Sequence, residues 1–263
     1  MARLPLKPLD DRLAVGKTTL TSRELREELG ISPRAASNLL TRWSKAGLVD
    51  RVARGRYAIR QIGLLGTRAL SEDVSLAVAA LVEGRPHRIS HHSALDFHGL
   101  LMRPVRTVQI SSPHRFSNAS ISGHPLQAVF ERADTVGLGT EPAGNGAVVS
   151  NLERTLLDAA ARPDLVGGYF PLVEALSSSK ARADRLLDLA IQLGAGPAIR
   201  RLGSLADQLK IGDLAGKLSP LASPQWDLDL DPELKRMSAG FRDETWRIRW
   251  PVSPEMIAEE LAH

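Results

Sequence analysis

Two short helices joined by a tight turn are encoded near the start of the chain, and this feature constrains the fold more than any other. Thr21 and Glu24 have the spacing of a capping box, which predicts the start of a helix. Gly30 is a typical helix stop, and Ser32 and Pro33 follow it as the next N-cap and first helical residue. The second helix is expected to run to about residue 46. The sequence therefore predicts a helix-turn-helix within residues 21–46.

The second of these helices is predicted to be amphipathic. Four apolar side chains share one face of a helical wheel: Ala36, Leu39, Leu40 and Trp43. The opposite face and its flanks carry cationic and hydrogen-bonding side chains: Arg34, Ser37, Asn38, Thr41, Arg42 and Lys45. An amphipathic helix that follows another helix after one short turn is typical of proteins that insert it into the major groove of DNA.

A basic hairpin is predicted after this pair of helices. Residues 48–53 and 57–59 have the pattern of two short strands, and Gly55 permits the tight turn between them. Arg54 and Arg56 flank that glycine and would form a basic wing. The basic surface is extended by Arg51 and Arg60. Residues 1–70 are therefore predicted to form a winged helix-turn-helix domain.

The charge of the chain is divided unevenly between its two parts. Residues 1–70 contain 14 Lys and Arg against 6 Asp and Glu, whereas residues 71–263 contain 20 against 24. The basic block predicts binding to a polyanion. Only 4% of the residues are aromatic, and single-stranded nucleic acids are usually bound by stacking on aromatic side chains. These features favour double-stranded DNA as the partner.

Roles for the DNA-facing side chains follow from their chemistry. Arg contacts guanine and Asn contacts adenine through two hydrogen bonds each. We therefore expect contacts to base edges from Arg34, Asn38 and Arg42. The remaining side chains are expected at phosphates or in a minor groove: Ser32, Ser37, Thr41, Lys45, Arg51, Arg54 and Arg56.

Residues 71–263 are predicted to form a second, helix-rich domain of mixed α/β structure, which makes the whole chain an α+β protein. Helices are expected over residues 74–82, 91–98, 151–162, 169–176, 181–193 and 197–209. Strands are expected over residues 105–111, 126–132, 147–149, 226–230 and 245–250, with residues 137–146 as a loop. Ser150 and Glu153 have the spacing of a second capping box, which would open the helix that runs to about residue 162.

No arrangement of side chains in this second domain predicts an active site. His87, His91, His92 and His98 lie close together in the sequence, but no cysteine or carboxylate spacing completes a zinc site. Ser90 lies next to His91, yet the glycine pattern that surrounds a hydrolase nucleophile is missing. The chain is therefore expected to have no catalytic residue, no metal and no cofactor.

Composition excludes several classes of protein. The chain has no cysteine, which excludes disulfides and zinc–thiolate sites. Its first residues lack the apolar run of a signal peptide, and no stretch reaches the roughly 18 apolar residues of a membrane span. We therefore expect a soluble, cytoplasmic protein.

Three stretches of the sequence resemble the AbiEi family of antitoxins from bacterial abortive-infection systems, which defend against phage. The first is the predicted winged helix around residues 24–59. The second is residues 89–100, which are similar to the family's serine-rich SxxSAlxxHGL helix. The third and most specific is residues 149–168, which are similar to the family's ERTLLD…P…GG segment.

The resemblance implies a division of labour between the two domains. The winged helix would bind an inverted repeat upstream of its own operon and repress transcription, as a homodimer if that operator is palindromic. The second domain would counteract a co-encoded nucleotidyltransferase toxin, either directly or functionally. Two other interpretations stay open: a repressor that responds to a small ligand and has no toxin partner, and an enzyme fused to a DNA-binding module.

Overall fold

The computed structural model describes residues 4–60, 70–82, 84–103, 105–116, 120–121, 124–222, 225–234 and 240–261. This part of the chain contains helices α1 to α11 and three sheets, and it divides into two compact units. The first unit comprises residues 1–89, 106–136 and 142–148, and the second comprises residues 90–105, 137–141 and 149–263. Among the described helices, none is both long and apolar enough to cross a membrane.

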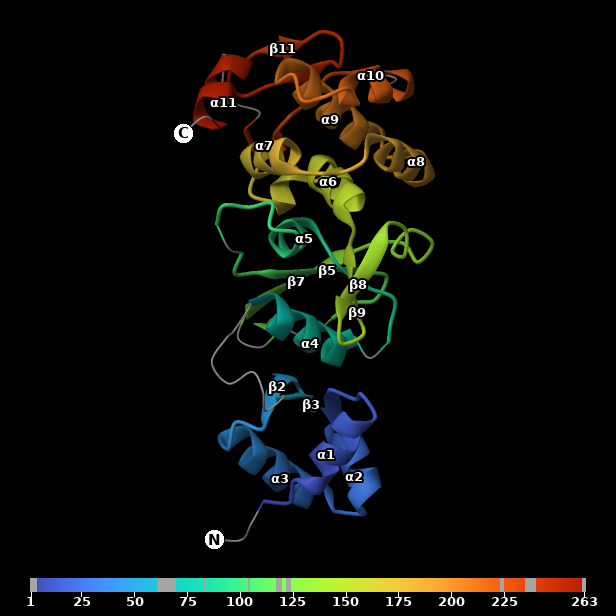
Figure 1. Cartoon of the computed structure of the whole chain (residues 1–263), viewed down its shortest axis with the longest axis vertical. Helices are drawn as coiled ribbons and strands as arrows, with labels where there is room; N and C mark the ends of the chain where they lie inside the picture. The colour runs from blue at the N-terminus through green and yellow to red at the C-terminus, as the bar shows by residue number, and fades with distance from the viewer. Residues whose placement is uncertain are drawn as a thin grey trace. The chain divides into compact units, whose positions relative to one another are not determined.

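The N-terminal part of the first unit contains three helices and a three-stranded antiparallel sheet (Figure 1). In chain order the elements are α1 (Lys7–Ala14), β1 (Thr19–Thr21), α2 (Ser22–Leu29), α3 (Pro33–Lys45), β2 (Val49–Ala53) and β3 (Arg56–Ile59). The strand order is β1-β3-β2, and β3 runs antiparallel to both neighbours. Two helices joined by a short turn and followed by a hairpin are consistent with the predicted winged helix-turn-helix.

Helices α2 and α3 begin and end where the sequence predicts. The hydroxyl of Thr21 accepts a hydrogen bond from the Glu24 amide at 3.1 Å, and the Glu24 carboxylate accepts one from the Thr21 amide at 2.7 Å, so the capping box is confirmed. Gly30 ends α2 in the left-handed conformation, with φ of 61°. Ser32 caps α3 by accepting a hydrogen bond from the Ala35 amide at 3.2 Å.

A small apolar core holds these helices against the sheet. The predicted inner face of α3 is confirmed, because Ala36, Leu40 and Trp43 are each at most 1% exposed. Trp43 shares this core with Leu25 of α2, and its indole Nε1 donates to the carbonyl oxygen of Pro5 at 3.1 Å. Fully burying a large apolar side chain contributes about 1.5–3 kcal/mol, and the hydrogen bond satisfies the one polar atom of the indole.

Strand β1 is not predicted by the sequence. Its three residues, Thr-Leu-Thr, are too few to show an alternating pattern. The strand forms because it pairs with β3, where Leu20 lies opposite Tyr57 and Thr21 lies opposite Arg56. Leu20 is only 1% exposed, so burial of this side chain also holds the strand in place.

Helix α4 (Leu70–Val82) packs against all three strands of this sheet and is grouped with them in the first unit (Figure 1). Its side chains Ala77, Val78 and Leu81 are at most 2% exposed, so the helix is buried on its apolar side. The sequence analysis places a domain boundary at residue 70, beside residues 61–69, which lie outside the described residues. The boundary between domains of residues 1–70 and 71–263 stays a prediction.

The middle of the chain contributes a six-stranded sheet with the strand order β6-β7-β5-β4-β9-β8. Its strands are β4 (Arg88–Ile89), β5 (Val108–Ser112), β6 (Ser120–Ile121), β7 (His124–Phe130), β8 (Thr140–Gly144) and β9 (Ala147–Ser150). Strands β5 and β7 are parallel, whereas β4 pairs antiparallel with β5 and β6 pairs antiparallel with β7.

The sequence predicts three of the six strands of this sheet, but it does not predict β4, β6 or β8. The strands expected near residues 105–111, 126–132 and 147–149 are confirmed as β5, β7 and β9. The expectation that residues 137–146 form a loop is wrong, because residues 140–144 form β8 beside β9. After its first residue, the segment Thr-Glu-Pro-Ala-Gly has no β-branched or aromatic side chain, so its local sequence does not indicate a strand.

The second unit consists mainly of helices. They are α5 (His91–Phe97), α6 (Leu152–Ala161), α7 (Tyr169–Ser178), α8 (Ala183–Leu193), α9 (Gly196–Gln208), α10 (Leu214–Leu218) and α11 (Pro254–Leu261). A small sheet accompanies them, with the order β10-β12-β11, formed by β10 (Leu228–Asp229), β11 (Arg242–Asp243) and β12 (Ile248–Arg249). Helices α5 to α9 and strands β10 and β12 confirm the sequence predictions, whereas α10, α11 and β11 are not predicted.

Helix α6 lies at the centre of the core of the second unit (Figure 1). It packs against α5, α7, α8 and α9, and all of its residues from 153 to 160 are buried. The sequence predicts burial of one side of this helix only. The polar side chains of α6 are therefore enclosed as well, and they need hydrogen-bonding partners within the protein.

A tryptophan side chain packs on the backbone of α9 and connects it to the C-terminal strands. A Cβ atom at Gly203 would lie 2.2 Å from Cη2 of Trp246, so only glycine fits there without movement of the ring. The hydroxyl of Ser204 donates to the carboxylate of Asp243 at 2.7 Å and accepts from the indole of Trp250 at 2.9 Å. These contacts fix β11 and β12 against α9.

Candidate nucleic-acid interface

One face of α3 is exposed along its whole length. All the predicted DNA-facing side chains of this helix and of its N-cap are exposed: Ser32, Arg34, Ser37, Asn38, Thr41, Arg42 and Lys45. The opposite face is anchored in the core through Trp43. The helix is therefore held rigidly from behind while its polar face is open to solvent.

Several of these exposed side chains have no partner among the described residues. Arg34, Asn38 and Lys45 form no side-chain hydrogen bond or ion pair with any described residue. The hydroxyl of Thr41 donates to the carbonyl oxygen of Ser37 at 2.8 Å, one turn earlier in the helix. Because Arg34 and Lys45 have no ion pair with a described residue that would have to be broken, these two cations are available for phosphates or base edges.

Arg12 holds the other helices in place behind α3, and the sequence analysis missed it. Its guanidinium donates to both carboxylate oxygens of Glu28, at 2.6 and 3.1 Å, and to the carbonyl oxygen of Thr19 at 3.0 Å. The arginine is only 5% exposed, although it belongs to the short helix α1. It thereby connects α1 to α2 and to β1. The only signal in the sequence is an arginine within an amphipathic segment, which is also typical of an exposed side chain.

The turn of the β2–β3 hairpin rests on the N-terminus of α2. Gly55 has φ of 74°, and its carbonyl oxygen accepts a hydrogen bond from the Ser22 amide at 2.9 Å. A Cβ atom at Gly55 would lie 3.1 Å from Oγ of Ser22, so the two segments are in close contact. Arg54, the residue before the glycine, is exposed and has no hydrogen bond or ion pair to any described residue. The wing is thus short and supported, with one cation at its turn.

The other arginines of the hairpin are not all directed to solvent. Arg51 on β2 is exposed, whereas Arg56 on β3 is half-buried. The guanidinium of Arg56 donates to the carbonyl oxygen of Leu81 in the last turn of α4. Arg60 donates to both carboxylate oxygens of Asp50, at 2.6 and 2.7 Å. The four cations predicted for the wing therefore divide into two with exposed side chains, Arg51 and Arg54, and two that are half-buried, Arg56 and Arg60.

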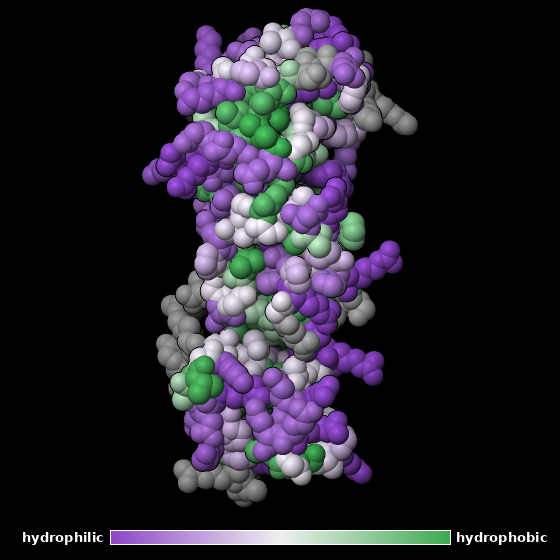
Figure 2. All heavy atoms as spheres, turned by 90° about the vertical axis from the view of Figure 1, so that its right-hand side faces the viewer, coloured by the Kyte–Doolittle hydropathy of each residue, from purple (hydrophilic) through white to green (hydrophobic). Residues whose placement is uncertain are grey.

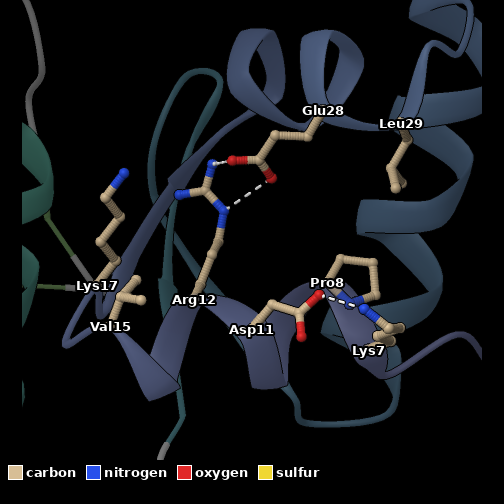
Figure 3. Close-up of a pocket in the computed structure, with 8 residues that line it drawn as sticks. All are labelled: Lys7, Pro8, Asp11, Arg12, Val15, Lys17, Glu28 and Leu29. Atoms are coloured by element: carbon tan, nitrogen blue, oxygen red, sulfur yellow. Dashed lines mark hydrogen bonds and ion pairs between the residues drawn. The ribbon is translucent and has the colours of Figure 1, made fainter.

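A shallow groove of about 420 Å³ lies between α1 and α2 (Figure 3). Its lining residues are Lys7, Pro8, Asp11, Arg12, Val15, Lys17, Glu28 and Leu29. Two ion pairs occupy its walls, Lys7 with Asp11 at 2.8 Å and Arg12 with Glu28 at 2.6 Å. The lining contains no serine, threonine or histidine, and its charged side chains are largely paired, so its chemistry is that of two helices packed through charged side chains.

The two further stretches that resemble AbiEi antitoxins meet in the interior of the second unit. From the first of them, Nε2 of His98 donates to the carbonyl oxygen of Ser150 at 2.6 Å. From the second, the hydroxyl of Thr155 donates to the same oxygen at 3.2 Å. Ser150 and Thr155 are fully buried. These hydrogen bonds therefore connect the end of α5 to the start of α6, and Ser150 and Thr155 are closed to a partner in solution.

The N-terminus of α6 is capped one residue later than the sequence predicts. Asn151, not Ser150, is the N-cap, and its side chain accepts from the Arg154 amide at 2.9 Å. Glu153 does not complete a capping box, because its carboxylate accepts a hydrogen bond from the Arg182 amide at 2.9 Å. The hydroxyl of Ser150 donates instead to the Asp158 carboxylate at 3.4 Å. Tertiary partners thus take both side chains that the local pattern assigns to the cap.

A buried ion pair lies along α6. Nε of Arg154 donates to the Asp158 carboxylate at 2.8 Å, and Nη1 of the same arginine donates to the carbonyl oxygen of Leu138 at 3.1 Å. The two side chains are 6% and 9% exposed. A Cβ atom at Gly139 would lie 2.9 Å from Cβ of Arg154, so the neighbouring loop packs directly against the arginine. The charged residues of this motif have a structural role.

The glycine pair at the end of the same motif accommodates a carboxylate. Gly168 has φ of 100°, and a Cβ atom there would lie 2.6 Å from Oδ2 of Asp231. That oxygen accepts a hydrogen bond from the Tyr169 amide at 3.1 Å, at the N-terminus of α7. A carboxylate at a helix N-terminus is favourable because it faces unpaired amides and the positive end of the helix dipole. The motif glycine therefore allows the C-terminal segment to cap α7.

The histidines predicted to be packed or exposed have interior partners. Burial lowers the pKa of His87 and of His92, so both imidazoles are neutral near pH 7. His91 is 5% exposed, and its Nδ1 lies 2.9 Å from the hydroxyl of Ser90, which is fully buried. In the described residues, no group of three or more His, Asp and Glu side chains is placed to hold a metal ion.

Exposed apolar side chains occur on both units, and those of the first unit include Val15 and Phe130. In the lower part of Figure 2, which shows the elements α1 to α3, hydrophilic side chains cover most of the visible face. In the upper part, at the level of α8 to α10, apolar side chains reach the surface. Large exposed apolar side chains of the second unit include Ile191, Trp226 and Met256, which are 57–58% exposed. Any partner of this unit meets such surface residues and not the buried motifs.

Comparison with known proteins relates the N-terminal segment to a regulatory family. Residues 9–60 match the family model described as "Transcriptional regulator, AbiEi antitoxin". The matched segment contains α2, α3 and the hairpin, and it confirms the resemblance of this part of the chain to the AbiEi antitoxins. The match supports a role as an antitoxin and transcriptional regulator, and the family is regulatory and not catalytic.

A similarity in fold extends over the whole chain. The crystal structure of the RV2827C protein from Mycobacterium tuberculosis superimposes with a TM-score of 0.64 and 16% sequence identity. The match covers 100% of this chain and 97% of that chain. At this level of identity the likeness shows a shared fold alone. No curated protein matches the sequence.

Proposed function

We propose that this chain is an antitoxin that also represses its own operon. A winged helix-turn-helix in residues 1–70 binds an inverted repeat in duplex DNA, and residues 71–263 counteract a cognate nucleotidyltransferase toxin. The observation that carries the proposal is the exposed face of α3, on which Arg34, Asn38 and Lys45 have no hydrogen bond or ion pair with any described residue. It lies within the segment that matches the AbiEi regulators.

Helix α3 has the dimensions and the chemistry of a helix that reads a major groove. Its 13 residues span about 20 Å at 1.5 Å per residue. Arg34 and Asn38 lie one turn apart on the exposed face, so both reach the floor of the groove together. In the proposal Arg34 and Arg42 bind guanine and Asn38 binds adenine.

The other exposed side chains position the domain on the DNA backbone. Lys45 at the end of α3 binds a phosphate, and Arg54 at the hairpin turn enters a minor groove or binds a phosphate beside it. The remaining contacts come from hydroxyl groups and from β2: Ser32, Ser37, Thr41 and Arg51. These contacts supply affinity and salt dependence but no base specificity.

Repression through an inverted repeat requires two copies of the domain. A two-fold operator is matched by a two-fold protein, with half-sites one or more helical turns apart. The chain therefore binds its operator as a homodimer. A duplex with only one half-site binds one copy, more weakly.

The second unit counteracts the toxin without chemistry of its own. Of the residues that resemble family motifs, Ser150, Arg154 and Asp158 are buried and hydrogen-bonded, and the matched family is regulatory. This arrangement supports an action through the surface of the unit, either on the toxin itself or on its effects.

Rescue from toxicity tests the antitoxin part of the proposal. The adjacent nucleotidyltransferase gene is expressed with the full-length chain and with a variant that combines Arg34→Ala, Asn38→Ala and Lys45→Ala. Full-length chains are used because α4 packs on the sheet of the N-terminal elements, and a cut at residue 70 would expose that face. We expect growth to be rescued by both chains and the operon to be repressed by the unchanged chain only.

Two results would contradict the proposal. Absence of rescue by the unchanged chain, when it is folded and expressed, would remove the antitoxin function. Repression that survives the triple substitution would remove α3 as the DNA-reading element. As a matched control, Arg132→Ala removes an exposed cation that is paired with Asp134, and it should leave both rescue and repression intact.

A further inference from the structure

Arg56 occupies an unusual place for a cation of a DNA-binding hairpin. It is half-buried on β3, whereas Arg54, two residues earlier, is exposed. Its guanidinium donates to the carbonyl oxygen of Leu81 in α4. The backbone of Arg56 pairs with Thr21 of β1 on one side and with Ala53 of β2 on the other, so it sits in the central strand of the sheet. The charged end of the side chain is therefore directed to α4.

The partner of Arg56, the carbonyl oxygen of Leu81, needs a hydrogen-bond donor from outside its own helix. Leu81 belongs to the last turn of α4, where carbonyl oxygens have no amide partner within the helix. The C-terminal end of a helix also carries the negative end of the helix dipole, which favours a cation. Basic side chains commonly bind such carbonyl groups. Arg56 thus caps α4 from a neighbouring strand.

The hairpin is consequently supported at two places near its turn. The carbonyl oxygen of Gly55 accepts from the Ser22 amide at 2.9 Å, which fixes the turn on the N-terminus of α2. The next residue, Arg56, fixes the start of β3 on the C-terminus of α4. Arg54 lies directly before these two anchors. Its position relative to α3 is therefore set before DNA binds, which reduces the ordering cost of binding.

We propose that Arg56 is a positioning residue of the DNA-binding surface, which holds the hairpin turn in place by capping α4 and does not itself touch DNA. The inference rests on the proposed binding of duplex DNA. The inference also makes α4 part of the DNA-binding unit. Loss of the hydrogen bond between Arg56 and Leu81 would release both the C-terminal end of α4 and the turn of the β2–β3 hairpin.

The salt dependence of binding separates a positioning residue from a phosphate contact. Each cation that neutralises a phosphate contributes about 0.9 to the slope of log affinity against log salt concentration. A residue that acts by position changes the affinity but leaves this slope unchanged. Arg54 and Arg56, which are two residues apart and have the same charge, form a matched pair for this comparison.

The experiment uses full-length protein and a labelled duplex from the region upstream of its own gene, titrated at several salt concentrations between about 50 and 200 mM. The variants are Arg54→Gln, Arg56→Gln and Arg56→Lys, with Arg132→Gln as the control for loss of one charge. We expect Arg54→Gln to reduce the slope by about 0.9. Arg56→Gln should weaken binding by about 3- to 10-fold at an unchanged slope, because the turn loses one of its two anchors.

Conservative replacement and hydrogen exchange complete the test. Arg56→Lys retains a donor for the Leu81 carbonyl oxygen and should bind DNA within about twofold of the unchanged chain. Without DNA, Arg56→Gln should accelerate amide exchange in residues 49–59 and at the end of α4, whereas Arg54→Gln should not.

Three results would overturn the inference. They are a slope reduced by Arg56→Gln as much as by Arg54→Gln, an unchanged affinity of folded Arg56→Gln protein, and unchanged amide exchange in that variant. Failure of the proposed DNA binding is recognised separately, because the unchanged chain would then not discriminate the upstream duplex from a scrambled duplex of equal length. The exchange measurement needs no DNA, so it tests the anchor of Arg56 in that case too.

Discussion

Helices α3 and α6 both begin at a polar N-cap and both carry arginine, but α3 leaves Arg34 in solvent whereas α6 buries Arg154. In α3 one apolar face is anchored in a core and the opposite face keeps unpaired polar groups. In α6 the polar side chains are enclosed, so each must be paired inside the protein. The difference teaches that a conspicuous charged motif can be structural, whereas the exposed face of α3 keeps Arg34, Asn38 and Lys45 without a partner among the described residues.

The largest expected effect comes from breaking the buried pair of α6. Asp158→Ala leaves the guanidinium of Arg154 without its carboxylate in an enclosed site, and such a loss costs about 3–5 kcal/mol. We expect this decrease in the free energy of unfolding, measured by urea denaturation. Asp134→Ala removes one partner of an exposed pair and is the control, with an expected loss below about 1 kcal/mol. Equal losses in the two variants would contradict the contrast between the helices.

A glycine-to-alanine pair tests how tightly the core around α6 and α9 is packed. Gly203→Ala places a methyl group against the ring of Trp246, and overpacking of this kind costs about 1–3 kcal/mol. Gly216 of α10 has open space at the same atom, so Gly216→Ala should be neutral or stabilising by up to about 1 kcal/mol. The midpoint of thermal unfolding, measured for both variants, tests this expectation. A Gly203→Ala protein as stable as Gly216→Ala would show that the ring moves freely.

Substitutions on the exposed face of α3 should affect DNA binding and not stability. Arg34→Ala or Asn38→Ala is expected to weaken binding to the operator by about 1–3 kcal/mol and to relax specificity at one base pair. The free energy of unfolding should change by less than about 0.5 kcal/mol, because both side chains are exposed. Binding is measured on the operator and on random duplexes. An equal loss on random DNA would show that these side chains do not read bases.

Lys45 provides a finer test of the same face. Lys45→Ala is expected to weaken binding to all duplexes alike and to flatten the dependence of log affinity on log salt by about 0.9. The reason is that a phosphate contact releases counterions but carries no sequence information. Titrations at several salt concentrations give the slope. A slope equal to that of the unchanged chain would place Lys45 away from the DNA backbone.

The smallest expected effect is on the stability of the protein at acidic pH. Hydrogen bonds from Arg242 and Arg247 hold the pKa of Asp227 at about 2, below the ordinary value of 3.8. A carboxyl group whose pKa is lowered by folding stabilises the protein above pH 3.8, and this contribution is lost as the pH falls towards 2. The Asp227 side chain is 26% exposed and lies at the surface, where solvent screens its ion pairs, so the loss is small. Asp227→Asn should reduce the pH dependence of the urea midpoint between pH 4 and pH 2. An unchanged dependence would show that the pair does not contribute.

The local signals of the N-terminal segment are sufficient to predict most of its structure. Caps and stops act over three or four residues, so Thr21, Glu24, Gly30 and Ser32 define the ends of α2 and α3 directly. The apolar face of α3 follows from its helical period. The same rule fails at α6, where Ser150 and Glu153 have the spacing of a cap but bind distant partners. A short pattern cannot reveal a partner that arrives from another part of the chain.

The sequence by itself determined the helix pair, the basic hairpin and the set of polar side chains on the outer face of α3, because periodicity, capping and turn chemistry are local. Only the tertiary structure decided which charged side chains are bound inside the protein and which remain available to contact a partner. It places Arg12 between α1, α2 and β1, and it commits Arg56 to the end of α4. The physical reason is that burial makes an unpaired charge costly, so charged side chains are assigned to partners by packing, and packing depends on residues far apart in the chain.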